Sequence, residues 1–219
     1  ASLERYREAI EPFKGRLLLG LTVVLGLFSG LAASGEWGRF LQWRNATPFG
    51  MTDPQFGLDV SFYTFELPFL RFLLGFAFAA TFIALALGVV VHYLFGGLRL
   101  QPKGDRATTA AQVQISITVA IFLFLKAIAY WLDRYDLVIQ SSDLAGGFTG
   151  LQYTDVNAKL PALNILTFVA LLVGLLFLLN AFRRQWIIPL IGLGLMVLTS
   201  VIVGGVYPLI VQQFQVRPS

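Results

Sequence analysis

The sequence contains no cysteine, only one histidine and few charged residues for its length. The absence of cysteine excludes disulfides and cysteine-ligated metal sites, and a single histidine leaves little for other transition-metal sites. Charged residues make up 13% of the 219 residues, whereas soluble domains typically carry roughly 25%. Hydrophobic residues make up 57%, and the mean hydropathy is +0.74. This composition predicts a membrane protein.

Five long apolar runs predict five membrane spans. Each run approaches or exceeds the ~18 to 20 residues that cross about 30 Å of hydrocarbon as a helix. Lipid offers no hydrogen bonds to backbone groups, so the predicted fold is an all-α polytopic transmembrane helical bundle. The first run also has features of a secretory signal peptide, but sixteen residues of mixed charge precede it, which favours a span. The predicted spans are 17–33, 68–95, 111–132, 161–182 and 187–211.

Two interfacial segments and one ordered loop are expected outside the spans. Residues 1–16 predict an amphipathic helix on the membrane surface, because apolar residues recur at helical spacing between charged ones. In the loop 34–67, GEWGRFLQWRN predicts a second interfacial segment, since tryptophans suit the membrane boundary. Residues 47–67 are too rich in proline, glycine and aspartate for a span. Their aromatic rings predict that they fold onto the loop 133–160. Residues 212–219 would begin a further region.

Lysine and arginine divide unevenly between the two sets of flanks, which predicts an orientation. The flanks 1–16, 96–109 and 183–186 hold nine basic and four acidic residues, whereas the opposite flanks hold five basic and eight acidic residues. By the positive-inside rule, the N-terminus of the chain is cytoplasmic and the loops 34–67 and 133–160 are external. The formal net charge of +4 therefore indicates topology, and no nucleic-acid partner is expected.

Four polar residues near predicted span ends are interpreted as interfacial or helix-end groups. His92 lies about one turn from the cytoplasmic boundary, where a hydrogen-bonded histidine is favoured over a proton relay. Asp53 and Asp59 could be considered for calcium, but their spacing lacks the ligand ladder of a calcium loop, so turn-forming roles are favoured. Arg134 follows the predicted end of the third span.

Prolines and small residues within the apolar runs indicate how the spans begin and pack. Pro68 and Pro161 each follow a leucine and open a span, and both follow an Asp–Val pair, in LDVSFYTFELPF and TDVNAKLPALNIL. Proline suits the first helical turn, where its missing N–H costs nothing. The recurrence leaves open a parallel repeat of two helical hairpins, as in many transporters. Small residues such as Gly26 and Gly30, or Gly75 and Ala79, predict close contact between helices.

Lys126 stands inside the third predicted span, in LFLKAIAYWLDRYD. If the span ends near Asp133, Lys126 lies about 10 Å below the boundary and its side chain tilts toward the membrane centre. A lysine in hydrocarbon costs about 2.5 to 3.5 kcal/mol, so a neighbouring acceptor is expected. The favoured hypothesis is a buried tie to the outer loops through Glu66, Asp133, Asp136 or helix-end carbonyls, with Glu66 the first choice. A charge in a substrate path and simple snorkelling are the two other interpretations.

Five stretches follow one another along the chain: DPQFGLDVSFYTFELPF, VHYLFGGLRL, LKAIAYWLDRY, FTGLQYTDVNAKLPA and IVGGVYPLIVQQFQVRP. Together they resemble the signature stretches of large bacterial membrane proteins grouped as uncharacterised protein family 0182. The resemblance implies a multi-pass protein of the bacterial cytoplasmic membrane, with two further spans before Ala1 and a large soluble region after Ser219. With the charge pattern, that region and the C-terminus would be external. The family implies no established activity and no catalytic residues.

The chain lacks the sequence patterns of an enzyme. It shows no nucleophile with a base, no histidine–carboxylate metal spacing, no phosphate loop and no paired carboxylates within a span, so no enzymatic activity, cofactor or metal is expected. The favoured function is to anchor and assemble the external region or partner membrane subunits in the lipid bilayer. The alternative is a transporter or conduit for a lipid or envelope precursor. Anchoring is favoured because the span interiors hold few polar residues besides Ser116, Asn164 and Lys126.

Overall fold

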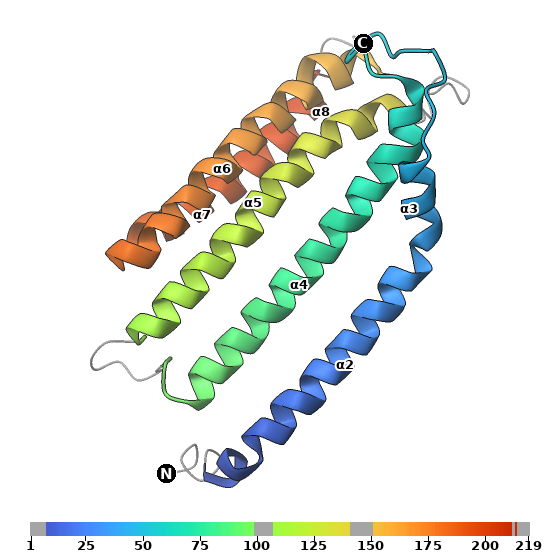
Figure 1. Cartoon of the computed structure of the whole chain (residues 1–219). Helices are drawn as coiled ribbons and strands as arrows, with labels where there is room; N and C mark the ends of the chain where they lie inside the picture. Colours follow the sequence, from blue (N-terminus) through green and yellow to red (C-terminus); the bar gives the residue numbers. More distant parts are fainter. Residues whose placement is uncertain (1–7, 99–106, 141–150, 212, 214–219) are drawn as a thin grey trace.

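The computed structural model describes residues 8–98, 107–140, 151–211 and 213, most of which are helical (Figure 1). Five helices have the length and composition to cross a membrane: Glu8–Gly35, Phe62–Leu94, Thr109–Ile139, Asp155–Arg183 and Ile187–Val211. The described ranges contain no strand, only isolated bridges at Thr52–Asp59 and Leu98–Ala107. The predicted all-α fold class is therefore confirmed.

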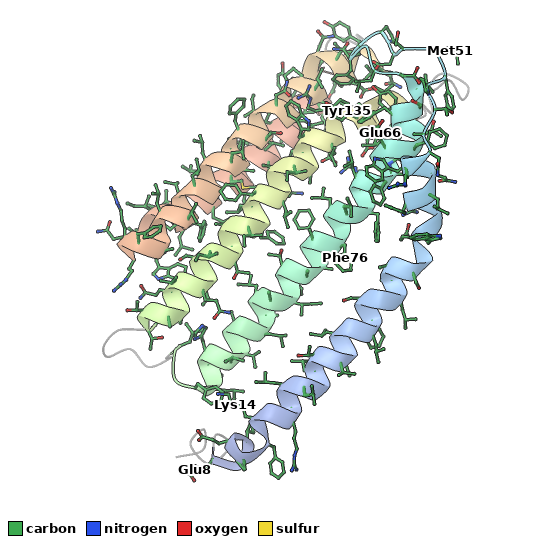
Figure 2. The ribbon with its side chains drawn as sticks, in the orientation of Figure 1. Glu8, Lys14, Met51, Glu66, Phe76 and Tyr135 are labelled. Carbon is green, nitrogen blue, oxygen red and sulfur yellow. The ribbon has the colours of Figure 1, made fainter. Side chains whose placement is uncertain are left out.

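The elements follow one another along the chain from the N-terminus to the C-terminus. After a 3-10 turn at Glu11–Phe13, the helices are α2 (Lys14–Gly35), α3 (Trp37–Arg44), α4 (Leu67–Leu94), α5 (Thr109–Ile139), α6 (Leu160–Arg183), α7 (Ile187–Val201) and α8 (Tyr207–Val211). Three π-helical turns complete the set: η2 (Phe62–Glu66), η4 (Asp155–Lys159) and η5 (Ile202–Val206). Figure 2 shows Met51, Glu66 and Tyr135 at one end of the bundle, called the cap end below, and Glu8 and Lys14 at the other, the basal end.

The helices extend further toward the cap end than predicted. The third span was expected to stop at residue 132, but α5 continues to Ile139, so the predicted loop 133–160 begins as helix. The helix continues because Tyr135 and Val138 pack against the same apolar cluster as Leu132. The predicted loop 34–67 likewise contains α3 and η2. Parts of three predicted segments, 1–7, 141–150 and 212–219 except 213, lie outside the described residues.

Each π-helical turn ends two residues before a proline. In η2 the Leu67 N–H bonds to the carbonyl of Phe62, five residues back, and Pro68 follows. The same pattern precedes Pro161 and Pro208. A proline ring would clash with the carbonyl four residues before it in a regular helix, and the wider turn moves that carbonyl away. A third such turn occurs within the last span, outside the two stretches that suggested a parallel repeat of helical hairpins. The proline by itself therefore explains the π-helical turn in each case.

The core lies chiefly between α5 and α6. Ala120, Leu123 and Ala127 of α5 are buried against Ala170 and Phe177 of α6. The two helices approach closely where α6 has a glycine: a Cβ at Gly174 would lie 2.8 Å from the Phe124 ring. Nearer the basal end, the buried Asn180 amide donates a 2.9 Å hydrogen bond to the buried Ser116 hydroxyl. The pair of helices therefore combines apolar packing with one buried polar contact, in which the Asn180 side-chain oxygen has no hydrogen-bond partner among the described residues.

Helix α2 stands apart from this core in Figure 1. None of its residues is buried, although its apolar composition suits a span. It is joined to the bundle through α3, and at the basal end the Lys14 ammonium lies 5.0 Å from the Phe95 ring centroid. The prediction that Gly26, Gly30 and Gly75 bring helices together is wrong for the described chain, because a Cβ at each would meet nothing within 4 Å.

Candidate functional site

The cap end is closed by a hydrogen-bonded loop, residues 45–61. Asp53 is 7% exposed and accepts four hydrogen bonds of 2.7–3.0 Å, three from backbone N–H groups and one from the Tyr63 hydroxyl. Asp59 accepts three bonds of 2.8–2.9 Å from backbone N–H groups, two of them at Phe49 and Gly50 across the loop. The interpretation of both residues as turn-forming aspartates is confirmed.

These hydrogen bonds also set the charge state of the two aspartates. Burial by itself would raise the pKa of Asp53, but its backbone donors and the Tyr63 hydroxyl hold that pKa below its ordinary value. The N–H groups of Phe49 and Ser61 lower the pKa of Asp59 to about 2. Both carboxylates are ionised at neutral pH and are engaged by the loop itself. Within the described ranges, no three His, Cys, Asp or Glu side chains are grouped to hold a metal ion.

Aromatic residues join the cap loop to the helices beneath it. The rings of Phe56 and Phe62 meet Tyr135 of α5 edge to face, with centroids 5.0 and 5.2 Å apart. The predicted contact between 47–67 and 133–160 is therefore found, on the helical part of the second segment. The predicted interfacial segment in GEWGRFLQWRN is helix α3, and its Trp43 stacks on Phe69 of α4 at 4.7 Å.

The helix-end residues His92 and Arg134 contact neighbouring elements of the bundle. His92, in the last turn of α4, pairs through Nε2 with the Gln114 side-chain oxygen of α5 at 2.8 Å. Arg134 lies over the rings of Trp131 and Phe56, 4.1 and 5.5 Å from their centroids. Because Phe56 belongs to the cap loop, Arg134 helps to hold this loop on α5 by cation–π contacts.

An arginine of α4 holds the two carboxylates of α5 that were considered for Lys126. The Arg71 guanidinium pairs with Asp133 at 2.7 Å and also with Asp136. The two aspartates are three residues apart and therefore lie on one face of α5. The three side chains are between 27% and 38% exposed. This is the charged tie between the second and third spans at the cap end.

The structure corrects the prediction that Lys126 pairs with a carboxylate. Asp133 and Asp136 belong to Arg71, and no ion pair joins Lys126 or Glu66 to another described residue. Instead, the Lys126 ammonium lies 4.5 Å from the Tyr130 ring centroid, one turn toward the cap end. Such a contact contributes roughly 0.5 to 2 kcal/mol, less than the 2.5 to 3.5 kcal/mol that a central lysine costs on insertion scales. The charge is only partly compensated.

Two hollows follow the same side of α5. The first, of about 350 Å³ at the cap end, is polar and includes Asp133, Asp136, Lys159 and Gly204. The second, of about 470 Å³, lies deeper and is almost entirely apolar, with Lys126, Tyr130 and Ser200 as its polar groups. We call the second hollow the Lys126 groove. Its geometry suits binding of an amphiphile, and its lining has no nucleophile paired with a base.

Two residues that join helices were missed in the sequence. Arg71 follows Pro68 inside an apolar run, and the spacing of Asp133 and Asp136 places them on one helix face. The sequence therefore also allowed Arg71, instead of Lys126, as the partner of these aspartates. Asn180 stands near the end of its span and Ser116 near the start of another. Their isolated polar positions in apolar runs were the only sequence signal that they could meet. Sequence spacing does not reveal which of several acceptors a cation reaches.

Comparison with known proteins places the chain among large relatives. The uncharacterised protein family UPF0182 matches residues 1–219. A UPF0182 protein of Streptomyces coelicolor is 52% identical over 220 residues, covering 100% of this chain and 22% of its own length. A UPF0182 protein of Frankia alni is 50% identical over 218 residues, with 100% and 21% covered. The chain thus spans about a fifth of the length of the curated relatives it matches. No solved structure matches it.

Proposed function

The chain belongs to the uncharacterised protein family UPF0182. We propose that it is a membrane bundle that anchors and assembles a much longer cell-envelope protein. The observation that carries the proposal is the cap. A loop with almost no regular structure is held rigidly over the helix ends by the Asp53 and Asp59 hydrogen bonds, by the aromatic contacts of Tyr135 and by Arg134. A built surface of this kind suits docking of another folded part.

The arrangement of the two ends of the bundle supports the same role. In Figure 1 the last described helix, α8, lies at the cap end, where it contacts η4. We propose that the cap end faces outside the cytoplasmic membrane, because the basic flanks gather at the basal end, where Arg183 and Arg184 close α6. The outer face of the cap exposes Met51 and Phe49, apolar side chains that a docked partner would cover.

Transport of a lipid or envelope precursor remains the second candidate function. The buried Asn180 amide N–H donates to the Ser116 hydroxyl within the bundle, and Arg71 is paired with its two aspartates. Alternating access generally requires polar groups that are free to engage a substrate near the midplane. Of the described span residues, Lys126 comes nearest to such a free polar group. Transport is therefore supported by the groove around Lys126 alone, whereas anchoring is supported by the whole cap.

Site-specific photo-crosslinking tests the anchoring proposal. A benzoylphenylalanine at Met51, which is 63% exposed, should crosslink in the full-length protein to its own region beyond Ser219 or to a membrane subunit. The matched control is Ile187, which is 66% exposed at the basal end and should give no such product. Mass spectrometry of the crosslinked peptides identifies the partner. Adducts with lipid alone at Met51, or the same protein adduct from both positions, would rule the cap out as a docking surface.

A further inference from the structure

The Lys126 groove is an open channel along the side of the bundle rather than an enclosed cavity. Its floor is α5, and its walls come from α4 through Phe82 and from α7 through Met196 and Val197. Phe82 and Val197 are 63% and 59% exposed, so the groove faces the surroundings of the bundle. In a bilayer those surroundings are acyl chains. The volume of about 470 Å³ falls within the 300 to 1,000 Å³ typical of ligand pockets.

Lys126 gives this groove a charge at the middle of the helix. It lies seventeen residues after Thr109 and thirteen before Ile139, which correspond to about 25 and 20 Å along the axis. A lysine side chain reaches neither helix end, but the charged residue Asp133 stands only about 10 Å further along α5 toward the cap end. Although helical side chains tilt toward the N-terminus of the helix, the ammonium lies over Tyr130, toward the cap end. The Tyr130 hydroxyl in turn lies 3.5 Å from the Ser200 hydroxyl of α7. Three polar groups from two helices thus converge in an apolar surface.

The described chain leaves this charge without an anion. The two nearest carboxylates along α5, Asp133 and Asp136, are held by Arg71. The polar hollow lies next along the same helices toward the cap end: Tyr130 and Ser200 line the groove, and Asp133 and Gly204 line the hollow. An acidic head group could therefore approach Lys126 from the cap end while a chain lies along the apolar lining.

We propose that the Lys126 groove binds an anionic phospholipid, with the phosphate beside the Lys126 ammonium and the Tyr130 hydroxyl and an acyl chain along Phe82 and Met196. A lipid is the occupant that the bilayer supplies to any groove open on its side, and the uncompensated ammonium selects an acidic head group. A second copy seated symmetrically would bring another Lys126 and add repulsion. The site is separate from the cap and does not depend on the anchoring function.

Lipid binding to the full-length protein in uncharged detergent tests this inference. Fluorescent phosphatidylglycerol and phosphatidylcholine with identical chains are titrated separately, and phosphatidylglycerol should bind at least fivefold more tightly. Lys126→Gln should remove that preference by weakening phosphatidylglycerol binding alone, and Lys126→Arg should retain it. Lys14→Gln is the matched control, because Lys14 also contacts an aromatic ring but lies at the basal end. It should leave both affinities unchanged.

A second variant keeps the test decisive if Lys126→Gln fails to fold. Val197→Trp alters an exposed groove residue, leaves the charge in place and should weaken both lipids about tenfold by filling the apolar part. Equal affinity of the wild-type protein for the two lipids would overturn the proposal. So would unchanged binding in Val197→Trp, or a zero-length crosslink from Lys126 to a carboxylate elsewhere in the full-length chain, which would identify a protein segment as the occupant.

Discussion

Replacing Arg71 by methionine should destabilise the bundle by about 2 kcal/mol. The substitution keeps most of the aliphatic stem but removes the guanidinium that pairs with Asp133 and Asp136. Each hydrogen bond to a charged group contributes about 1.5 to 3 kcal/mol, and leaving a buried charge unpaired costs about 3 to 5 kcal/mol. The side chains are between 27% and 38% exposed. Solvent therefore compensates part of the loss, which places the expected value toward the lower end of these ranges.

The assay is equilibrium unfolding of the full-length protein in mixed micelles with increasing SDS. Arg71→Met is compared with the Asp133→Asn/Asp136→Asn variant and with the triple variant in a mutant cycle, and the coupling energy should be about 1 to 2 kcal/mol. Arg39→Met is the matched control. Arg39 also pairs with a carboxylate, Glu36 at 2.8 Å, but it is 52% exposed, so its loss should cost less than about 0.5 kcal/mol.

The tie would be refuted by a coupling energy indistinguishable from zero, or by an Arg71→Met variant as stable as Arg39→Met. Either result would mean that the apolar and aromatic contacts at the cap end hold α4 and α5 together unaided. A loss confined to Asp133→Asn/Asp136→Asn would instead show that the aspartates act through another cation. These outcomes separate the ion pair from general packing at this end of the bundle.

Three further predictions follow from the topology, the cap and the core. In a cysteine-free background, a cysteine at Gln55 should react with an impermeant maleimide in intact cells and one at Gln185 only after lysis; the opposite pattern would invert the proposed orientation. Because the folded pKa of Asp59 is lowered to about 2, its stabilisation of the cap is complete above pH 4 and is lost as the pH falls toward 2. The protection of the loop 45–61 against hydrogen exchange, relative to intrinsic rates at each pH, should therefore fall over that interval, and Asp59→Asn should reduce this pH dependence to the part due to Asp53; equal protection at pH 5 and pH 2 in the wild type would contradict this. Asn180→Ala should destabilise the bundle by about 1 to 3 kcal/mol, since it removes the partner of the buried Ser116 hydroxyl, and Asn180→Leu with Ser116→Ala should recover most of the loss; the same SDS titration measures both.

The sequence was sufficient to predict the class of fold and the helices that form it. Apolar length is a local property, and in lipid a backbone segment must satisfy its own hydrogen bonds, so each long run implies a helix without knowledge of its neighbours. The same holds for the turn-forming aspartates, because Asp53 and Asp59 bond mainly to backbone groups within ten residues. The family resemblance is also confirmed, because the family matches residues 1–219. It could be predicted from the sequence because it depends on the order of five stretches and requires no knowledge of contacts.

The tertiary structure decided which polar groups meet. Lys126, Arg71 and the two aspartates of α5 lie in or beside apolar runs, and sequence spacing made Asp133 and Asp136 candidates for Lys126. Lys126 lies on α5 itself, about 10 Å along the axis from Asp133, whereas the packing of α4 on α5 brings Arg71 to both aspartates. Lys126 is left over Tyr130 in a groove that exists only because α4 and α7 flank α5. Rotation and crossing of helices depend on the sum of many weak contacts between distant segments, which no single stretch of sequence contains.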